Sequence, residues 1–438
     1  MNKRIINTFT LGFALFAIFF GAGNLVFPPT IGLASGTSWV PAFIGFGITG
    51  IILPLLAVFA ILNFGGSFED LTKPISSWFH KVFNLFLMVG IGAFVTIPRM
   101  AATTHELGIH ILFPDAPSIV TIIVFFSICF YFTMDKTNVV DKIGKILTPL
   151  LIVILIVIVG KGIFDPIGSP VKTDLKNPFS NAFISAYQTG DVVTGIFCAP
   201  IFIAAIIGHG YKGAAMRKVA ARGVIIAGLG LTIVYGGLLF IGAEGSAIFR
   251  QGTSSTALVS AIVDQVLGNF GAVALAIAIA LACLTSAIGV IPVIADFLNK
   301  LTKEKVGYRI WALIICILAA AVGSFGVDNI INYTMPIFTV LYPVAIVLVI
   351  LGVFRTFIPN PGAYRGTILL TFLTSLIAAL GTLGLKVPVL AQLITILPLS
   401  SQGFAWLVPA VIGFVLGAAI HKGADHKMEK ESTISANE

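Results

Sequence analysis

Long apolar stretches alternate along this chain with short segments that hold most of its charge. A helix that crosses the hydrocarbon core of a bilayer needs about 20 mostly apolar residues. Only 10% of the residues are Asp, Glu, Lys or Arg, against roughly 25% in soluble domains. We therefore predict an all-α membrane protein with about twelve transmembrane helices. The predicted spans cover residues 5–33, 39–64, 79–101, 118–134, 143–164, 182–208, 223–248, 269–298, 308–325, 331–355, 366–384 and 402–421.

Basic residues predict how these helices are oriented. With this set of spans, about 20 of the 26 Lys and Arg residues fall on the side of the N-terminus. Cytoplasmic loops are enriched in Lys and Arg, so we expect both termini to be cytoplasmic. The net charge of +8 is explained by these loops, and we expect no nucleic-acid partner. The short, proline-flanked stretch 387–399 is interpreted as a loop or interfacial piece, and 422–438 as a cytoplasmic tail.

The first span carries residues that disfavour a helix near its middle. Gly21, Gly23 and Asn24 lie there, and Pro28 and Pro29 follow. In a helix interior, glycine costs about 1 kcal/mol and proline about 3 kcal/mol. We expect the helix to stop near Gly21 and to restart near Asn24, with both prolines near the first turn of the second half.

A break of this kind places backbone groups with partial charge inside the bilayer. Free carbonyls at the end of the first half suit a cation, and free N–H groups at the start of the second half suit a carboxylate. A zwitterion and a cation would then both be accommodated. The alternative is a glycine hinge that only packs closely against another helix.

The sixth span repeats this pattern with Gly190, Gly195 and Pro200. Asp191 is the acidic residue that we place within a span, where a charge costs about 2.5–3.5 kcal/mol on insertion scales and indicates a functional site. The alternative is that Asp191 lies near the outer water interface.

The matched breaks predict an inverted repeat. Five spans form an odd number, so a second unit of five would enter the membrane from the opposite face. Residues 5–164 would form the first repeat and 182–355 the second, with two extra helices over 366–421. Many secondary transporters have this arrangement, with their binding site between the repeats.

The eighth span holds Thr285 and Ser286 near its midpoint, at the depth of the first break. Hydroxyl and carbonyl oxygens suit hard cations. The alternative is that these hydroxyls bond to their own backbone or to a neighbouring helix.

Other polar or reactive residues have simpler interpretations. The four cysteines fit buried small apolar side chains, and His105, Glu106 and His110 lie in an expected outer loop without a third firm metal ligand. Arg99 lies near an expected helix end, where it could reach water. The cysteines are Cys129, Cys198, Cys283 and Cys316. Asp296 lies at the cytoplasmic end of the eighth span, so it too has a simpler interpretation than a direct role.

The string Phe-Phe-Gly-Ala-Gly-Asn-Leu-Val-Phe-Pro-Pro at residues 19–29 resembles the signature of the bacterial branched-chain amino acid:cation symporters, the transport system II carrier family. The stretches Tyr187–Asp191 and Ala282–Ser286 support the resemblance, which extends over nearly the whole chain. It implies a leucine-transporter-type fold in the cell membrane. It also implies uptake of L-leucine, L-isoleucine and L-valine, driven by sodium or, in some members, by protons.

The resemblance also implies roles for individual residues. The implied sodium ligands are backbone and hydroxyl oxygens, namely the carbonyls of Ala17, Phe20 and Ala282 and the hydroxyls of Thr285 and Ser286. The implied substrate site lies at the two breaks, with Gly21, Ala22, Gly23 and Asn24 at the carboxylate and Gly190, Asp191 and Thr194 near the amine or side chain. Pro28-Pro29 departs from the wider fold, in which an arginine-containing stretch can precede a single proline, so gating residues are not carried over.

Other function classes fit the sequence less well. A proton-coupled carrier of other small apolar amino acids, with Asp191 as the titrating group, is the main alternative. A channel would need rings of charges or carbonyls along a pore, and an enzyme would need a nucleophile–base pair or a metal motif such as H-E-x-x-H within the spans. We expect no enzyme activity and no cofactor apart from the coupling ion, Na+ or H+.

Overall fold

The computed structural model describes residues 3–76, 78–134, 148–383 and 388–435. Every regular element in these ranges is helical. The chain divides into two compact units, one of residues 1–55 and 86–334 and the other of residues 56–85 and 335–438. Among the described residues, seven helical stretches are long and apolar enough to cross a membrane, and six shorter apolar helices accompany them.

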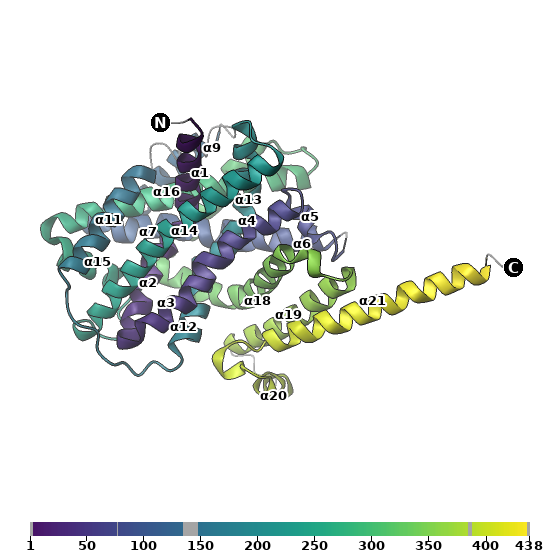
Figure 1. The fold of residues 1–438 in the computed structure, drawn as a ribbon. Coiled ribbons are helices and arrows are strands. Elements are labelled where there is room, and N and C mark those ends of the chain that lie inside the picture. Colours follow the sequence, from purple (N-terminus) through teal and green to yellow (C-terminus); the bar gives the residue numbers. More distant parts are fainter. Residues whose placement is uncertain (1–2, 77, 135–147, 384–387, 436–438) are drawn as a thin grey trace. The chain divides into compact units, whose positions relative to one another are not determined.

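The first unit contains most of the helices (Figure 1). Its α-helices are α1 (Lys3–Phe19), α2 (Ala22–Ser35), α3 (Trp39–Gly47), α7 (Ile97–Thr104), α8 (His110–Leu112), α9 (Ser118–Thr133), α11 (Thr148–Phe164), α12 (Pro178–Ser185), α13 (Asp191–Gly208), α14 (Gly213–Glu244), α15 (Ser255–Leu267), α16 (Gly271–Leu301) and α17 (Tyr308–Gly323). Two α-helices run from one unit into the other along the chain, α4 (Leu53–Asn63) and α18 (Val327–Val353).

Short 3-10 and π segments interrupt or extend the helices of this unit. They are η1 (Gly36–Ser38), η2 (Ile48–Ile52), η3 (Phe86–Thr96), η4 (His105–Ile109), η6 (Ala186–Thr189), η7 (Gly245–Ala247) and η8 (Gly268–Phe270). The π segments η2, η3 and η4 join directly to α-helices, so the backbone between Phe86 and Leu112 is helical throughout.

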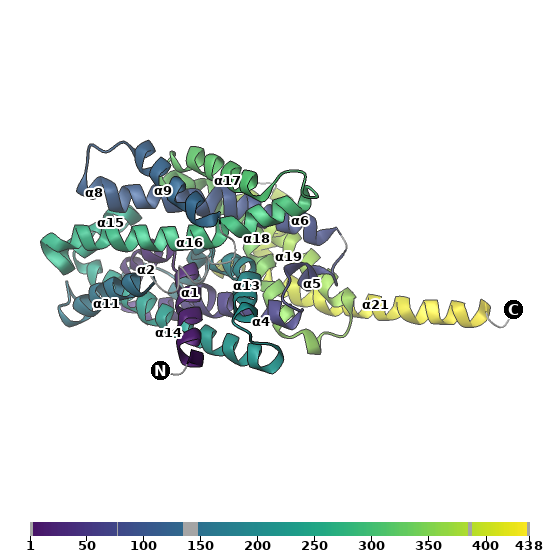
Figure 2. The same cartoon turned by 90° about the horizontal axis from the view of Figure 1, so that it is seen from above.

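Helix α14 packs along both halves of the first predicted span, and α16 passes beside α1 (Figure 2). The contact between α2 and α14 brings two backbones together. A Cβ atom on Gly32 would clash with the carbonyl oxygen of Leu239, and one on Gly242 would clash with that of Pro29. Small residues allow this approach between membrane helices, so α2 is held firmly against α14.

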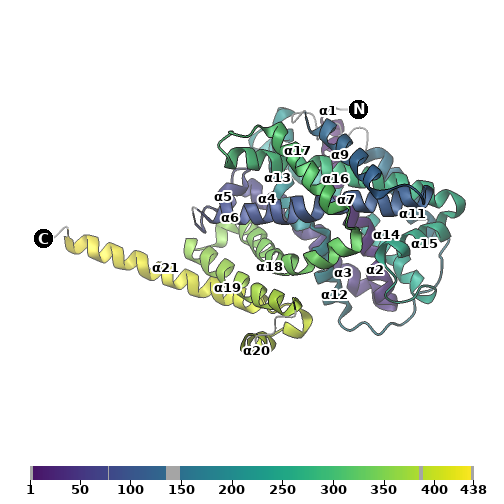
Figure 3. The same cartoon turned by 180° about the vertical axis from the view of Figure 1, so that it is seen from behind.

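The second unit contains α5 (Phe68–Thr72), α6 (Phe79–Leu85), η9 (Arg355–Phe357), α19 (Pro361–Thr382), α20 (Pro388–Ile396), η10 (Ser400–Gln402) and α21 (Leu407–Ser435). Helices α19 and α21 lie side by side (Figure 3). Two glycine pairs spaced four residues apart face each other across this contact, Gly362 and Gly366 on α19 and Gly413 and Gly417 on α21. Each would place a Cβ atom against the opposing backbone, so only glycine fits.

The structure corrects two expectations about helix boundaries. Residues 387–399 were expected to be a loop or interfacial piece; Pro388–Ile396 form the short helix α20, which excludes a loop over these residues. Its proline lies at the first helical position, where a missing N–H group costs little. The sequence analysis also missed α15 (Ser255–Leu267), whose start is capped by Ser254: its hydroxyl accepts a hydrogen bond from Ala257 N–H at 3.4 Å.

We predict that Gly366→Ala destabilises the protein. The added methyl group would force α19 and α21 apart, at a cost of about 1–3 kcal/mol for an overpacked contact. The midpoint of thermal unfolding in detergent should fall by several degrees. Gly381→Ala is the matched control on the same helix, because a Cβ atom there meets no other atom within 4 Å. Equal midpoints for the two variants would contradict the proposed packing.

Candidate functional site

The first predicted span is broken where its glycines lie. Helix α1 ends at Phe19 and α2 begins at Ala22. Between them Gly21 is extended, with φ −106° and ψ −166°. Its N–H group donates to Asn24 Oδ1 at 3.3 Å, so the Asn24 side chain caps the new helix. This confirms the break.

The second half of the first predicted span begins earlier in the sequence than expected. Because α2 already begins at Ala22, Pro28 and Pro29 lie inside the helix rather than near its first turn. The Asn24 side chain bonds to the N–H of Gly21, one residue before the helix begins. The carbonyl of Pro29 then faces Gly242 of α14, in the close backbone contact described above.

The sixth predicted span is broken in a related way. Helix α12 ends at Ser185, a 3-10 turn follows, and α13 begins at Asp191. Gly190 joins them with φ +76°, a left-handed conformation that favours glycine. The N–H of Asp191 donates to Thr189 Oγ1 at 3.3 Å. Asp191 is only 1% exposed, so its side chain is buried inside the unit.

The two breaks meet through a direct hydrogen bond. The side-chain amide of Asn24 donates to Asp191 Oδ2 at 2.6 Å and also to the hydroxyl oxygen of Tyr235 on α14. The Tyr235 hydroxyl donates in turn to Asp191 Oδ2 at 3.5 Å. All three side chains are buried. Polar groups inside a membrane protein need such partners, so this contact joins α2, α13 and α14 at one point.

Hydroxyl and carbonyl oxygens gather beside the first break. Thr285 Oγ1 on α16 donates to the carbonyl oxygens of Ala17 at 3.2 Å and Ala282 at 3.0 Å. Ser286 Oγ donates to those of Ala17 at 3.1 Å and Ile18 at 3.0 Å. Four of the five expected ion ligands thus lie together, and the carbonyl of Ile18, which the sequence analysis did not name, joins the cluster.

These contacts are also the ones that the alternative predicted, because each hydroxyl bonds to α1 and Thr285 also bonds to its own helix. The fifth expected ligand, Phe20, follows the end of α1. Its N–H donates to the carbonyl of Phe16 at 2.8 Å, and its ring lies 5.8 Å from that of Tyr235.

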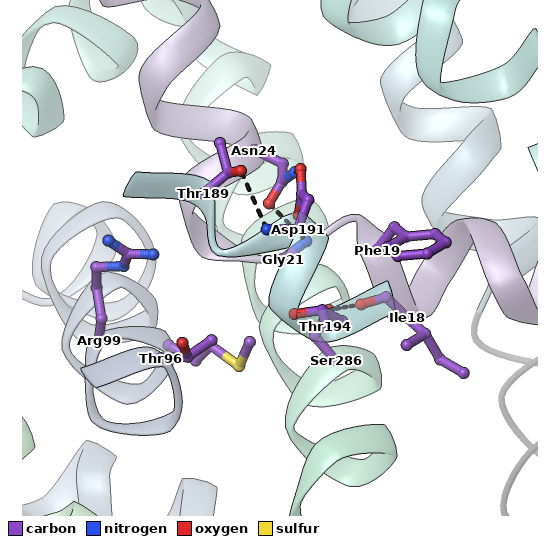
Figure 4. Close-up of a pocket in the computed structure, with 12 residues that line it drawn as sticks. Ile18, Phe19, Gly21, Asn24, Thr96, Arg99, Thr189, Asp191, Thr194 and Ser286 are labelled. Atoms are coloured by element: carbon purple, nitrogen blue, oxygen red, sulfur yellow. Dashed lines mark hydrogen bonds between the residues drawn. The ribbon is translucent and has the colours of Figure 1, made fainter. Parts of the chain in front are cut away.

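A cavity of about 10 Å³ lies between the breaks (Figure 4). Both helix breaks contribute to its lining, together with α16 and the helical stretch through η3 and α7. The lining residues are Ile18, Phe19, Gly21, Gly23, Asn24, Thr96, Arg99, Met100, Thr189, Asp191, Thr194 and Ser286. A cavity of this volume is about the smallest that can hold one water molecule. Five expected substrate residues line it, whereas Ala22 lies in the first turn of α2 and Gly190 forms the second break.

Gly21 and Gly23 leave room for side chains of neighbouring helices beside this cavity. A Cβ atom on Gly21 would lie 3.2 Å from Ser286 Oγ and 3.2 Å from the methyl carbon of Met100. A Cβ atom on Gly23 would lie 3.2 Å from Arg99 Nη2. Each glycine of the first break therefore allows a polar side chain to approach the backbone.

Arg99 is the main residue of this site whose position was wrongly predicted. It was expected near a helix end with access to water, but it is 2% exposed and lines the cavity. Its Nη2 donates to the carbonyl of Gln188 at 2.5 Å, and its guanidinium lies 5.5 Å from the centre of the Phe27 ring. The sequence analysis placed the end of the third span too early, at residue 101. Its helical backbone continues to Leu112 through small and polar residues, which places Arg99 well inside.

The same longer helix corrects the expected outer loop. His105 and Glu106 lie in η4 and His110 in α8. Glu106 Oε1 accepts a hydrogen bond from the N–H of Val327 at 2.8 Å, at the start of α18, and His105 Nδ1 lies 3.0 Å from Thr121 Oγ1. Within the described ranges, no group of three or more His, Cys, Asp or Glu residues could hold a metal ion. The four cysteines are buried, as expected.

Comparison of the sequence with known proteins identifies its relatives. The family model described as "Branched-chain amino acid transport protein" matches residues 4–424. The branched-chain amino acid permease BraB of Bacillus subtilis (strain 168) is 30% identical over 421 residues, covering 94% of this chain and 94% of the relative. The branched-chain amino acid transport system 2 carrier protein of Pseudomonas aeruginosa is 31% identical over 416 residues, covering 93% and 94%.

Solved structures show that the fold is that of known transporters. A Na+-coupled sialic acid symporter in a substrate-bound outward-open state has a TM-score of 0.59 at 15% identity, covering 94% of this chain and 89% of the other. MhsT in complex with L-phenylalanine has a TM-score of 0.56 at 19% identity, covering 93% and 98%. These similarities support the expected leucine-transporter-type fold.

The sequence relatives are permeases and transport carriers rather than enzymes. Their similarity extends over nearly the full length of this chain, and the 19–29 motif forms the first helix break in the structure. The chain therefore belongs to the family of branched-chain amino acid transport proteins.

Proposed function

We propose that this protein is a symporter that uses a sodium gradient to take up leucine, isoleucine and valine across the cell membrane. The observation that carries the proposal is the contact between the two broken helices, where Asn24 and Asp191 share a hydrogen bond at 2.6 Å. The N-terminal turns of α2 and α13 meet there through buried polar side chains, and the C-terminal end of α1 contributes carbonyl oxygens to a nearby cluster of hydroxyl and carbonyl oxygens.

The substrate's two charged groups match the two breaks. Backbone N–H groups at the start of α2, from Gly21 through Ala22 and Gly23 to Asn24, would receive the α-carboxylate. Asp191 would receive the α-ammonium group, and Thr194 lies one turn further along α13, on the same cavity. Gly190 supplies the turn that presents Asp191.

The sodium site would use the oxygen cluster on α1 and α16. Sodium is a hard cation that suits neutral hydroxyl and carbonyl oxygens. The proposed ligands are the carbonyls of Ala17, Phe20 and Ala282 and the hydroxyls of Thr285 and Ser286, with the carbonyl of Ile18 close by. On binding, the ion would take the place of the hydroxyl protons that now bond to these carbonyls.

The close approach of Ser286 to Gly21 suggests how ion and substrate are coupled. An ion held by Ser286 would lie next to the amides that receive the carboxylate, so each charge would favour binding of the other. Such mutual preference is the coupling free energy that symport requires.

The size of the cavity implies a conformational cycle. A space of about 10 Å³ is far smaller than a leucine side chain, so the surrounding helices must separate to admit the substrate. We propose that residues 5–164 and 182–355 act as the two inverted repeats that move against each other, while 366–421 add two helices outside them. Both termini would face the cytoplasm.

We predict that leucine uptake into proteoliposomes depends on an inward sodium gradient. Uptake should disappear when choline replaces sodium at constant pH, because choline cannot enter an oxygen site of this size. Competition by the twenty amino acids against labelled leucine would rank the substrates. Full uptake in choline, driven by a proton gradient, would instead support proton coupling through Asp191, the acidic residue of the cavity lining.

We further predict that Thr285→Ala raises the sodium concentration for half-maximal uptake by about 10-fold or more, because a ligand to a charged group is lost. Thr285→Ser keeps the hydroxyl and should retain most of the sodium affinity. Thr232→Ala is a matched control, because its exposed hydroxyl bonds only within α14, to the carbonyl of Gly228 at 2.7 Å. An unchanged sodium requirement in Thr285→Ala would remove the ion site from this position.

A further inference from the structure

Arg99 is a second buried charge at the cavity, and the proposed function does not use it. A charged side chain within the membrane is costly and usually marks a functional position. We propose that Arg99 binds the α-carboxylate of the substrate, so that Arg99 and Asp191 together recognise the two opposite charges of a free amino acid. This inference rests on the proposed function, because it names how the same site selects its substrate.

The position of Arg99 brings it to the carboxylate end of the site. Gly23 leaves room for the guanidinium: an added Cβ atom would lie 3.2 Å from Arg99 Nη2 and 3.2 Å from the Cα of Thr189. The positive end of α2 and the positive charge of Arg99 thus converge at the first break, and a carboxylate there would be attracted by both.

The planar geometry of a guanidinium group suits it to binding a carboxylate. Arg99 is held in place by the carbonyl of Gln188 at 2.5 Å and by the ring of Phe27, whose centre is 5.5 Å from its central carbon. A guanidinium presents five N–H donors in a plane, so one edge can bond to the protein while another binds a carboxylate through two parallel bonds. Figure 4 shows Arg99 and Asp191 reaching the cavity from different helices.

The charge balance of the site also favours a zwitterion. Arg99 and Asp191 carry opposite charges and line the same cavity. A free amino acid carries one positive and one negative group, so it can satisfy both side chains and leave no added net charge in the membrane. A ligand that lacks one of these charges would leave either Arg99 or Asp191 without its substrate partner. The site would therefore discriminate strongly against such a ligand.

A purely structural role for Arg99 makes different predictions. If Arg99 served only to compensate the charge of Asp191, removing both charges together would restore binding. If it served only to tie α7 to η6, its loss would weaken all ligands equally. Leucine analogues that each lack one charged group distinguish both of these structural roles from carboxylate recognition.

The experiment measures inhibition of labelled leucine uptake in proteoliposomes by three compounds: leucine, leucinamide, which lacks the carboxylate charge, and 4-methylpentanoate, which lacks the ammonium group. In Arg99→Gln we expect the apparent affinity for leucine to fall by about 10- to 100-fold, the effect of losing a charged hydrogen-bond partner. Inhibition by leucinamide, which is a cation, should be unchanged or stronger. In Asp191→Asn the preference should shift in the opposite direction, towards 4-methylpentanoate.

Further variants keep the test decisive. Arg99→Lys should keep part of the preference for leucine over leucinamide, because it retains the charge but not the planar fork. The double variant Arg99→Gln/Asp191→Asn should bind leucine no better than either single variant. Arg250→Gln removes an equal charge from an exposed position and should change nothing.

Two results would overturn the assignment. One is an Arg99→Gln variant that keeps the full preference for leucine over leucinamide, or loses affinity for both equally. The other is recovery of leucine binding in the double variant. If the unmodified protein does not take up leucine under any ion gradient, the proposed function itself fails, which is a separate outcome. If Arg99→Gln does not fold, the comparison of Arg99→Lys with the unmodified protein decides.

Discussion

The contact between the two helix breaks is the interaction on which the rest of the site depends. A broken helix inside a membrane exposes backbone groups that lipid cannot satisfy. Here the side chain of Asn24 accepts a hydrogen bond from the Gly21 N–H and donates to Asp191, so one residue supports both breaks. Tyr235 joins them to α14. Polar groups of the two breaks therefore satisfy one another.

Glycine has a separate purpose at each position of this site. Gly190 provides a left-handed turn that other residues rarely adopt. Gly21 admits Ser286, and Gly23 admits Arg99. The absence of a side chain at these three positions allows the hydroxyl of Ser286, the carboxylate of Asp191 and the guanidinium of Arg99 to converge on one small cavity. The glycines that interrupt the first helix thus also create the space that these side chains occupy.

Much of the site could be predicted from local sequence. The breaks at Gly21 and Gly190 were predicted because glycine and proline disfavour a helix wherever they occur. The positions of Thr285 and Ser286 were predicted from their depth in the eighth span. Arg99 was misplaced because the end of the third helix was set too early, and helix ends are the least certain feature of such predictions. The small and polar residues after Arg99 resemble a loop, although packing keeps them helical.

The sequence by itself determined that the chain spans a membrane, where its first and sixth helices break, and which family it belongs to. Apolar length, backbone preferences and a short motif are local properties, so they can be read along the chain. Only the tertiary structure decided that Asp191 and Arg99 are both buried at the same cavity and that Ile18 joins the oxygen cluster. Those facts depend on which distant segments pack together, and no local pattern specifies that.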